Sequence, residues 1–236
     1  MTSPRHVGRI IGMLLLAHLA AGLIVPYVML RPLTAGFLET AAGMAAQVRL
    51  GVLLLFVGGA LPVGISVAAW PAVRARGYGP GFWLLALAVV NFASQIVENA
   101  HWLSMLSVSQ AYAEAGASDA GLFPLLGVAV RSAWKWAHYS HILVVVGWIF
   151  TLYCVLVRCA LVPRALAAVG MGTSVLHFIG ITLPVFAGYR MPFPTLFGMP
   201  LGLAYLVLAA WLMAKGFKDP RDVPRAGAHG VEVSGA

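Results

Sequence analysis

The sequence predicts an all-α fold, a polytopic transmembrane bundle of six helices, and three observations lead to this prediction. Hydrophobic residues make up 61% of the 236-residue chain and charged residues only 9%, with a mean hydropathy of +0.91. Soluble domains typically have about a quarter of their residues charged, so the composition excludes that class. The apolar residues also gather in runs of about 20, the length that crosses a bilayer.

Six such runs follow one another along the chain. The first is longer than the apolar core of a signal peptide and is therefore expected to stay as a helix. Turns such as RARGYGPG and RCALVPRA separate the later runs. A single membrane domain is expected over residues 1–214, followed by a tail, residues 215–236, whose Pro, Gly and charge predict disorder. The expected spans are residues 9–30, 48–71, 82–108, 134–157, 164–187 and 195–214.

Lysine and arginine residues near the helix ends predict the orientation, because cytoplasmic ends collect an excess of them. Ten lie on one side of the six spans and five on the other, which places both termini in the cytoplasm and the chain in a bacterial inner membrane. The net charge of +8 is dispersed over these ends, so contact with membrane lipids is expected and a nucleic-acid partner is not. The ten are Arg5, Arg9, Arg74, Arg76, Arg158, Arg164, Lys215, Lys218, Arg221 and Arg225; the five are Arg31, Arg49, Arg131, Lys135 and Arg190.

Five histidines and one glutamate lie inside the expected spans, in addition to the basic residues at the span ends. A charged side chain there costs about 2.5–3.5 kcal/mol on insertion scales, so each is a candidate for a functional site. A neutral histidine also serves as an ordinary hydrogen-bonded packing residue, whereas Glu98 is the only acid in the spans and is harder to explain by packing. The six are His18, Glu98, His101, His138, His141 and His177.

Two of the spans present polar faces. In span 82–108, Asn91, Gln95, Glu98 and His101 recur every three to four residues, the spacing of one helical face. A rise of ~1.5 Å per residue puts Glu98 and His141 at similar depths, with His101 and His138 about one turn further outward and His177 near the middle. Arg131, Lys135, His138 and His141 form a second polar line that enters span 134–157. We therefore expect one outward-opening cavity bordered by Glu98, His101, His138, His141 and His177.

Acid–base chemistry on a lipid-like molecule is the first hypothesis for this cavity. Glu98 with His141 or His101 would form the catalytic acid–base pair, because an imidazole can hold or relay the proton of a carboxyl group. Arg131 and Lys135 would bind the anionic head of a hydrophobic small molecule.

Three alternatives stay open. A metal could be bound by His101, His138, His141 and His177, and a b-type haem could lie between His101 and His138. Neither cofactor is favoured, since a di-iron site needs more acids and the glycines that haem packing requires are not grouped around these histidines. The third alternative is non-enzymatic, a small-molecule transporter or a membrane interaction subunit, and the Gly198–Gly202 spacing would permit a homo-oligomer.

Four stretches of the sequence also carry a family resemblance. They are RIIGMLLLAHLAAGLI, QIVENAHWLSML, AHYSHILVVVGWIFTLYCVLV and LVPRALAAVGMGTSVL. By pattern over most of residues 8–214, the chain resembles the bacterial domain-of-unknown-function family 4386. The resemblance implies a six-span membrane fold and no established activity. The cluster around Glu98 matches no motif of that family, so the resemblance assigns it no role.

Overall fold

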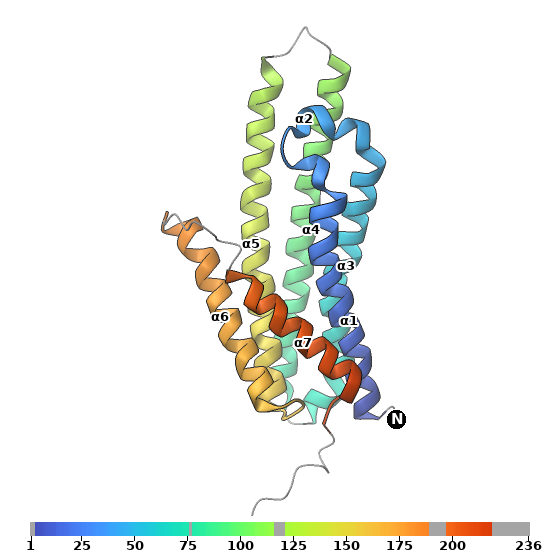
Figure 1. Cartoon of the computed structure of the whole chain (residues 1–236), viewed down its shortest axis with the longest axis vertical. Coiled ribbons are helices and arrows are strands. Elements are labelled where there is room, and N and C mark those ends of the chain that lie inside the picture. Colours follow the sequence, from blue (N-terminus) through green and yellow to red (C-terminus); the bar gives the residue numbers. More distant parts are fainter. Residues whose placement is uncertain (1–2, 76, 116–120, 189–196, 219–236) are drawn as a thin grey trace, which may run out of the picture.

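A computed structural model describes residues 3–75, 77–115, 121–188 and 197–218 (Figure 1). This part of the chain is helical and contains no strand, which confirms the all-α fold class. Three short helical segments, Arg31–Leu33, α2 (Phe37–Thr40) and Ala42–Met44, link the first two long helices. The long helices are α1 (Pro4–Ile24, continued by a π-helical turn over Val25–Met29), α3 (Ala45–Arg74), α4 (Tyr78–Ala115), α5 (Leu122–Arg158), α6 (Arg164–Phe186) and α7 (Met199–Lys215).

Six apolar helices fit the six-span bundle that the sequence predicts. Five of the described helical segments, those containing α1, α3, α4, α5 and α6, are long and apolar enough to cross a membrane. The sixth, α7, is a shorter apolar helix of 17 residues, at the lower end of the range that spans hydrocarbon. The chain is therefore a membrane-embedded helical protein.

The helices form a closed ring in chain order. Each of α1, α3, α4, α5, α6 and α7 contacts the next, and α7 returns to contact α1. Glycines permit the closest approach, between α1 and α7: a Cβ on Gly12 would lie 2.7 Å from the backbone nitrogen of Met213. Figure 1 shows that α6 and α7 take part only in the lower half of the ring, while α4 and α5 extend far above them.

The α4–α5 pair is longer than the sequence predicts. Residues 109–133 were expected to lie outside the spans, yet α4 continues to Ala115 and α5 begins at Leu122. At ~1.5 Å per residue each helix is about 55 Å long, against a hydrocarbon core of about 30 Å. Ser109 fixes the extension, since its Oγ accepts from the backbone nitrogen of Ala42 and donates to the carbonyl of Leu38, both at 2.9 Å.

Two clusters of buried apolar side chains fill the ring. The lower cluster joins all six long helices and includes Trp148, Tyr153 and Tyr205. The upper cluster packs the end of α1 and the short helices against α3 and α4, and it contains Trp102. The side chain of Trp102 is buried in this cluster, where the short segments pack against α3 and α4.

The packed domain also extends beyond the predicted boundary at residue 214. Phe217 is 1% exposed and belongs to the lower cluster. The backbone nitrogen of Lys218 donates to the carbonyl of Leu161 at 2.9 Å. The first residues of the expected tail are therefore packed, and residues 219–236 lie outside the described residues.

Candidate functional site

A layer of polar side chains lies between the upper and lower clusters. On α4 it falls between Ala88, which belongs to the lower cluster, and Trp102, which belongs to the upper one. On α5 it lies above Val146, where the buried lower cluster begins. Buried polar groups need hydrogen-bond partners, so this layer determines how the two helices are joined. It consists of Asn91, Gln95, Glu98 and Asn99 from α4, with His138 and His141 from α5.

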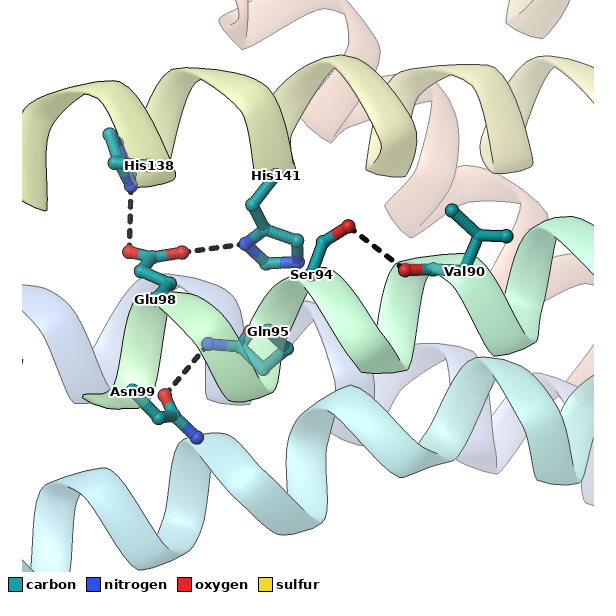
Figure 2. Close-up of polar contacts among 7 residues, drawn as sticks. All are labelled: Val90, Ser94, Gln95, Glu98, Asn99, His138 and His141. Atoms are coloured by element: carbon teal, nitrogen blue, oxygen red, sulfur yellow. Dashed lines mark hydrogen bonds and ion pairs between the residues drawn. The ribbon is translucent and has the colours of Figure 1, made fainter. Parts of the chain in front are cut away.

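The Glu98 carboxyl group connects α4 to α5. Its Oε1 lies 2.8 Å from Nδ1 of His138 and its Oε2 lies 2.6 Å from Nδ1 of His141. The two histidines are three residues apart, so one face of α5 presents both. Figure 2 shows the two rings projecting from α5 onto the acid of the neighbouring helix. We call these three residues, His138, Glu98 and His141, the Glu98 triad.

The amides of Gln95 and Asn99 on α4 point away from the triad, toward α3 (Figure 2). Gln95 donates from Nε2 to Oδ1 of Asn99 at 2.9 Å. A Cβ on Gly59 of α3 would lie 2.7 Å from Cγ of Gln95, so this glycine makes room for the amide pair. Ser94 donates to the carbonyl of Val90 on its own helix. The triad is therefore a separate unit that involves α4 and α5 alone.

The triad has one partly exposed end, and its other two residues are buried. The side chain of His138 is 34% exposed to solvent. As whole residues, Glu98 is 4% and His141 9% exposed. The Nε2 atom of His141 is buried and has no hydrogen-bond partner among the described residues. The triad thus leads from a partly exposed ring to a buried ring nitrogen that still needs a partner.

The triad can hold a proton in two ways. An ionised Glu98 accepts from Nδ1–H of both histidines, whereas a neutral Glu98 accepts from one and donates to the other. Both arrangements satisfy the two carboxyl oxygens, and both leave Nε2 of each ring for groups outside the triad. The arrangement can therefore store one proton or pass one along.

A surface cavity of about 410 Å³ lies beside His138. We call it the α5 groove, because all of its lining residues belong to that helix. The ring of Trp134 stacks on His138 with 5.2 Å between centroids, and it packs against Trp102 at 4.4 Å. Trp134, which lines the groove, therefore contacts both the triad and the upper cluster. Its lining residues are Val128, Arg131, Ser132, Trp134, Lys135, His138 and Tyr139.

The predicted head-group residues Arg131 and Lys135 both line the α5 groove and are exposed. The predicted cavity was expected to be bordered by five residues, Glu98 and four histidines. Only His138 of these five borders the α5 groove. Glu98 and His141 lie behind it, covered by α4 and α5. The structure therefore separates an exposed cationic groove from a buried acid–base triad and joins them at His138.

The other two predicted histidines stand apart from the triad. His101 is partly buried on α4, and His177 lies on α6 with a buried Nδ1 that has no hydrogen-bond partner in the described part of the chain. Within that part, no group of three or more His, Cys, Asp or Glu side chains is arranged to hold a metal ion. The metal and haem hypotheses gain no support from these positions and stay predictions, as do the catalytic roles.

Sequence reasoning missed two tyrosines in the lower half of the ring. Nδ1 of His18 lies 2.9 Å from the hydroxyl of Tyr205 on α7. The hydroxyl of Tyr153 on α5 is buried without a hydrogen-bond partner among the described residues. Tyr205 lies in the middle of the expected span 195–214 instead of at its ends, where tyrosine is usual in membrane helices. That position was the signal in the sequence that could have indicated Tyr205.

Comparison with known proteins gives a family and no function. Residues 10–216 match the model of a family described as Domain of unknown function (DUF4386). No curated protein and no solved structure matches the chain.

Proposed function

Because the chain belongs to the family Domain of unknown function (DUF4386), whose description assigns no activity, we propose a function from the geometry of the site. The chain binds a membrane amphiphile with an anionic head in the α5 groove, and it exchanges a proton with that head through the Glu98 triad. The observation that carries this proposal is the position of His138, which lines the groove and is hydrogen-bonded to Glu98 at the same time.

The lining of the groove suits an anionic amphiphile. Arg131 and Lys135 supply two positive charges, and Ser132 supplies a hydroxyl group. Arginine pairs with phosphate or carboxylate groups through two hydrogen bonds, and lysine adds a point charge. Val128 and Tyr139 give the same groove an apolar wall along which an acyl chain can lie.

His138 can carry the proton between the groove and the buried acid. Its Nδ1 is engaged by Glu98, so Nε2 is the ring nitrogen that remains for a ligand in the groove. A proton taken up on Nε2 allows the proton on Nδ1 to move to Glu98, because a histidine ring can accept on one nitrogen and release from the other. A carboxyl group beside an imidazole is a common acid–base pair.

The distribution of basic residues supports an orientation for this site. The described residues of the more basic side, among them Arg9, Arg74 and Lys215, lie at the ends of α1, α3 and α7 that meet at the lower end in Figure 1. We propose that this end faces the bacterial cytoplasm, with both termini there. The α5 groove then opens toward the outer leaflet of the inner membrane.

Lipid binding to purified protein tests the ligand. Native mass spectrometry would compare phosphatidylglycerol, which is anionic, with phosphatidylcholine, which is zwitterionic. We expect the wild type to retain phosphatidylglycerol preferentially, and the double variant Arg131→Gln/Lys135→Gln to lose at least about tenfold in affinity, which is roughly 1.4 kcal/mol.

The matched control is Arg31→Gln/Arg49→Gln, which removes two exposed arginines from the same expected side of the membrane. This control should bind phosphatidylglycerol like the wild type. Equal loss in the two double variants would show that surface charge alone attracts the lipid, and it would contradict binding in the α5 groove.

A further inference from the structure

The Glu98 triad ends inside the ring, at a nitrogen atom with no partner. Nε2 of His141 is buried and makes no hydrogen bond among the described residues, while its Nδ1 is held by Glu98. A buried polar atom without a partner costs about 1–3 kcal/mol, and an ordered water molecule commonly removes that cost. The position of this nitrogen therefore calls for a polar neighbour on the side away from the α5 groove.

His18 of α1 is a candidate for such a neighbour in the lower half of the ring. Its ring packs edge-on against Trp148 with 5.7 Å between centroids, and Trp148 lies two helical turns below His141 on the same face of α5. The contact with Trp148 therefore places His18 beside the face of α5 that also carries His141.

Two tyrosines continue the line below His18. Nδ1 of His18 lies 2.9 Å from the hydroxyl of Tyr205, and Tyr205 belongs to the same buried lower cluster as Tyr153. The Tyr153 hydroxyl is buried without a partner in the described part of the chain. Arg158 ends α5 about 7 Å of helix rise below Tyr153, so the line stops close to the lower end of the bundle.

We propose that these groups form a proton path through the membrane, leading from the α5 groove through the Glu98 triad and His18 to Tyr205 and Tyr153. One water molecule bridges His141 to His18, and a second bridges Tyr205 to Tyr153. The path extends the proposed role of the triad from exchange with a ligand to transfer across the bilayer, and it rests on that role only for the proton step between His138 and Glu98.

In the resting state every group of the path is neutral. In the conducting arrangement, His138 donates from Nδ1 to Oε1 of Glu98, neutral Glu98 donates from Oε2 to Nδ1 of His141, and His141 donates from Nε2 to the water. A proton that arrives on Nε2 of His138 shifts each of these protons by one position. One proton enters at the groove, one leaves to the water, and no group gains net charge.

The lower half of the path works in the same way. The water passes a proton to the other ring nitrogen of His18, Nε2, and the proton on Nδ1 moves to the Tyr205 oxygen. Tyr205 releases its own hydroxyl proton to the second water, which passes a proton to the Tyr153 oxygen, since a hydroxyl group both donates and accepts. Tyr153 in turn releases its hydroxyl proton to water at the lower end of the bundle. Each step forms one O–H or N–H bond and breaks one, so the path needs no oxidant or reductant.

Proton flux into vesicles tests the path. The full-length protein would be placed in phosphatidylcholine vesicles with a minority of phosphatidylglycerol, a pH-sensitive dye inside and a potassium diffusion potential as the driving force. Wild-type vesicles should acidify faster than protein-free vesicles. Tyr205→Phe, which removes one hydroxyl group and keeps the ring, should slow this flux at least about tenfold, and Glu98→Gln should do the same.

The matched control is Tyr27→Phe, which removes the hydroxyl group of an exposed tyrosine at the end of α1 and should conduct like the wild type. His18→Gln serves as a second variant of the lower half if Tyr205→Phe does not fold. Wild-type flux equal to that of protein-free vesicles, or wild-type flux in folded Tyr205→Phe and His18→Gln, would overturn the path.

The two proposals fail separately. A protein that retains phosphatidylglycerol without conducting protons would overturn the path and leave the proposed function intact. A protein that conducts protons without preferring phosphatidylglycerol would support the path and contradict the proposed ligand.

Discussion

Glu98 joins two helices through one side chain, and the effect of replacing it on stability depends on which residue replaces it. Glu98→Ala removes the acceptor of both Nδ1 atoms, which lie 2.8 and 2.6 Å from the carboxyl oxygens. Each buried group left without a partner costs about 1–3 kcal/mol. Glu98→Gln keeps one acceptor and adds an amide donor, so it can satisfy both rings in one combination of tautomers.

We therefore predict that Glu98→Ala loses at least about 2 kcal/mol of stability, while Glu98→Gln stays close to the wild type. Reversible unfolding in detergent, followed by circular dichroism, measures the difference. Equal stability of the two variants would mean that the bonds to His138 and His141 do not hold α4 and α5 together.

The spacing of residues predicted part of the site. Glu98, His138 and His141 could be identified because polar residues repeat every three to four positions within apolar runs. Their pairing across two helices follows from packing, which one sequence does not specify. His101 shares the spacing of Glu98 and still lies outside the triad, because helical periodicity leaves a residue three positions away free to point up to about 60° to the side.

Tyr205 and Tyr153 illustrate the opposite case. A tyrosine in an apolar run counts as a hydrophobic residue, so its hydroxyl group attracts no notice until its neighbours are known. Tyr205 meets His18 from a helix that is far away in the sequence. Contacts of this kind depend on the closure of the ring between α1 and α7, and no local pattern predicts that closure.

At the scale of the elements, α5 and α6 are held together around the Tyr153 ring. A Cβ on Gly170 of α6 would overlap this ring, whereas a Cβ on Gly172 of the same helix would have no atom within 4 Å. Only the first glycine is required by packing, because the backbone of α6 lies directly on the aromatic side chain.

Alanine at these two positions should therefore behave differently. Gly170→Ala forces α6 or Tyr153 to move, and overpacking of this kind typically costs about 1–3 kcal/mol. Gly172→Ala should be neutral or slightly stabilising, because alanine favours the helix. Thermal unfolding of the two variants in the same detergent measures the difference, and equal melting temperatures would contradict the close approach of α6 to Tyr153.

The lengths of the helices show where hydropathy fails as a predictor. The runs that were counted as spans end where charged residues such as Arg131 begin, so the sequence predicted a long connection between residues 108 and 134. The helices α4 and α5 continue past that boundary. Hydropathy indicates which part of a helix suits hydrocarbon, but it does not indicate where the hydrogen bonding of the helix ends. The α5 groove begins in this extended region, at Val128, and continues into the predicted span as far as Tyr139.

At the scale of the whole molecule, unequal helix lengths create the site. The six helices close a ring, but α6 and α7 accompany only the lower part of α5 in Figure 1. The upper part of α5 therefore keeps an uncovered face with Arg131, Lys135 and His138. Composition and run length were sufficient to predict the six long apolar helices of the described chain and their order. The groove depends on which of these helices end early.

His138 connects the surface groove to the buried Glu98, and nitrogen NMR of ¹⁵N-histidine-labelled protein tests this connection most directly. In phosphatidylcholine nanodiscs, phosphatidylglycerol would be added stepwise while the imidazole nitrogens of His138 and His141 are followed. We predict that both residues respond together in the wild type, because Glu98 accepts from or donates to both rings. In Arg131→Gln/Lys135→Gln neither should respond. A response confined to His138, or none in the wild type, would contradict the account.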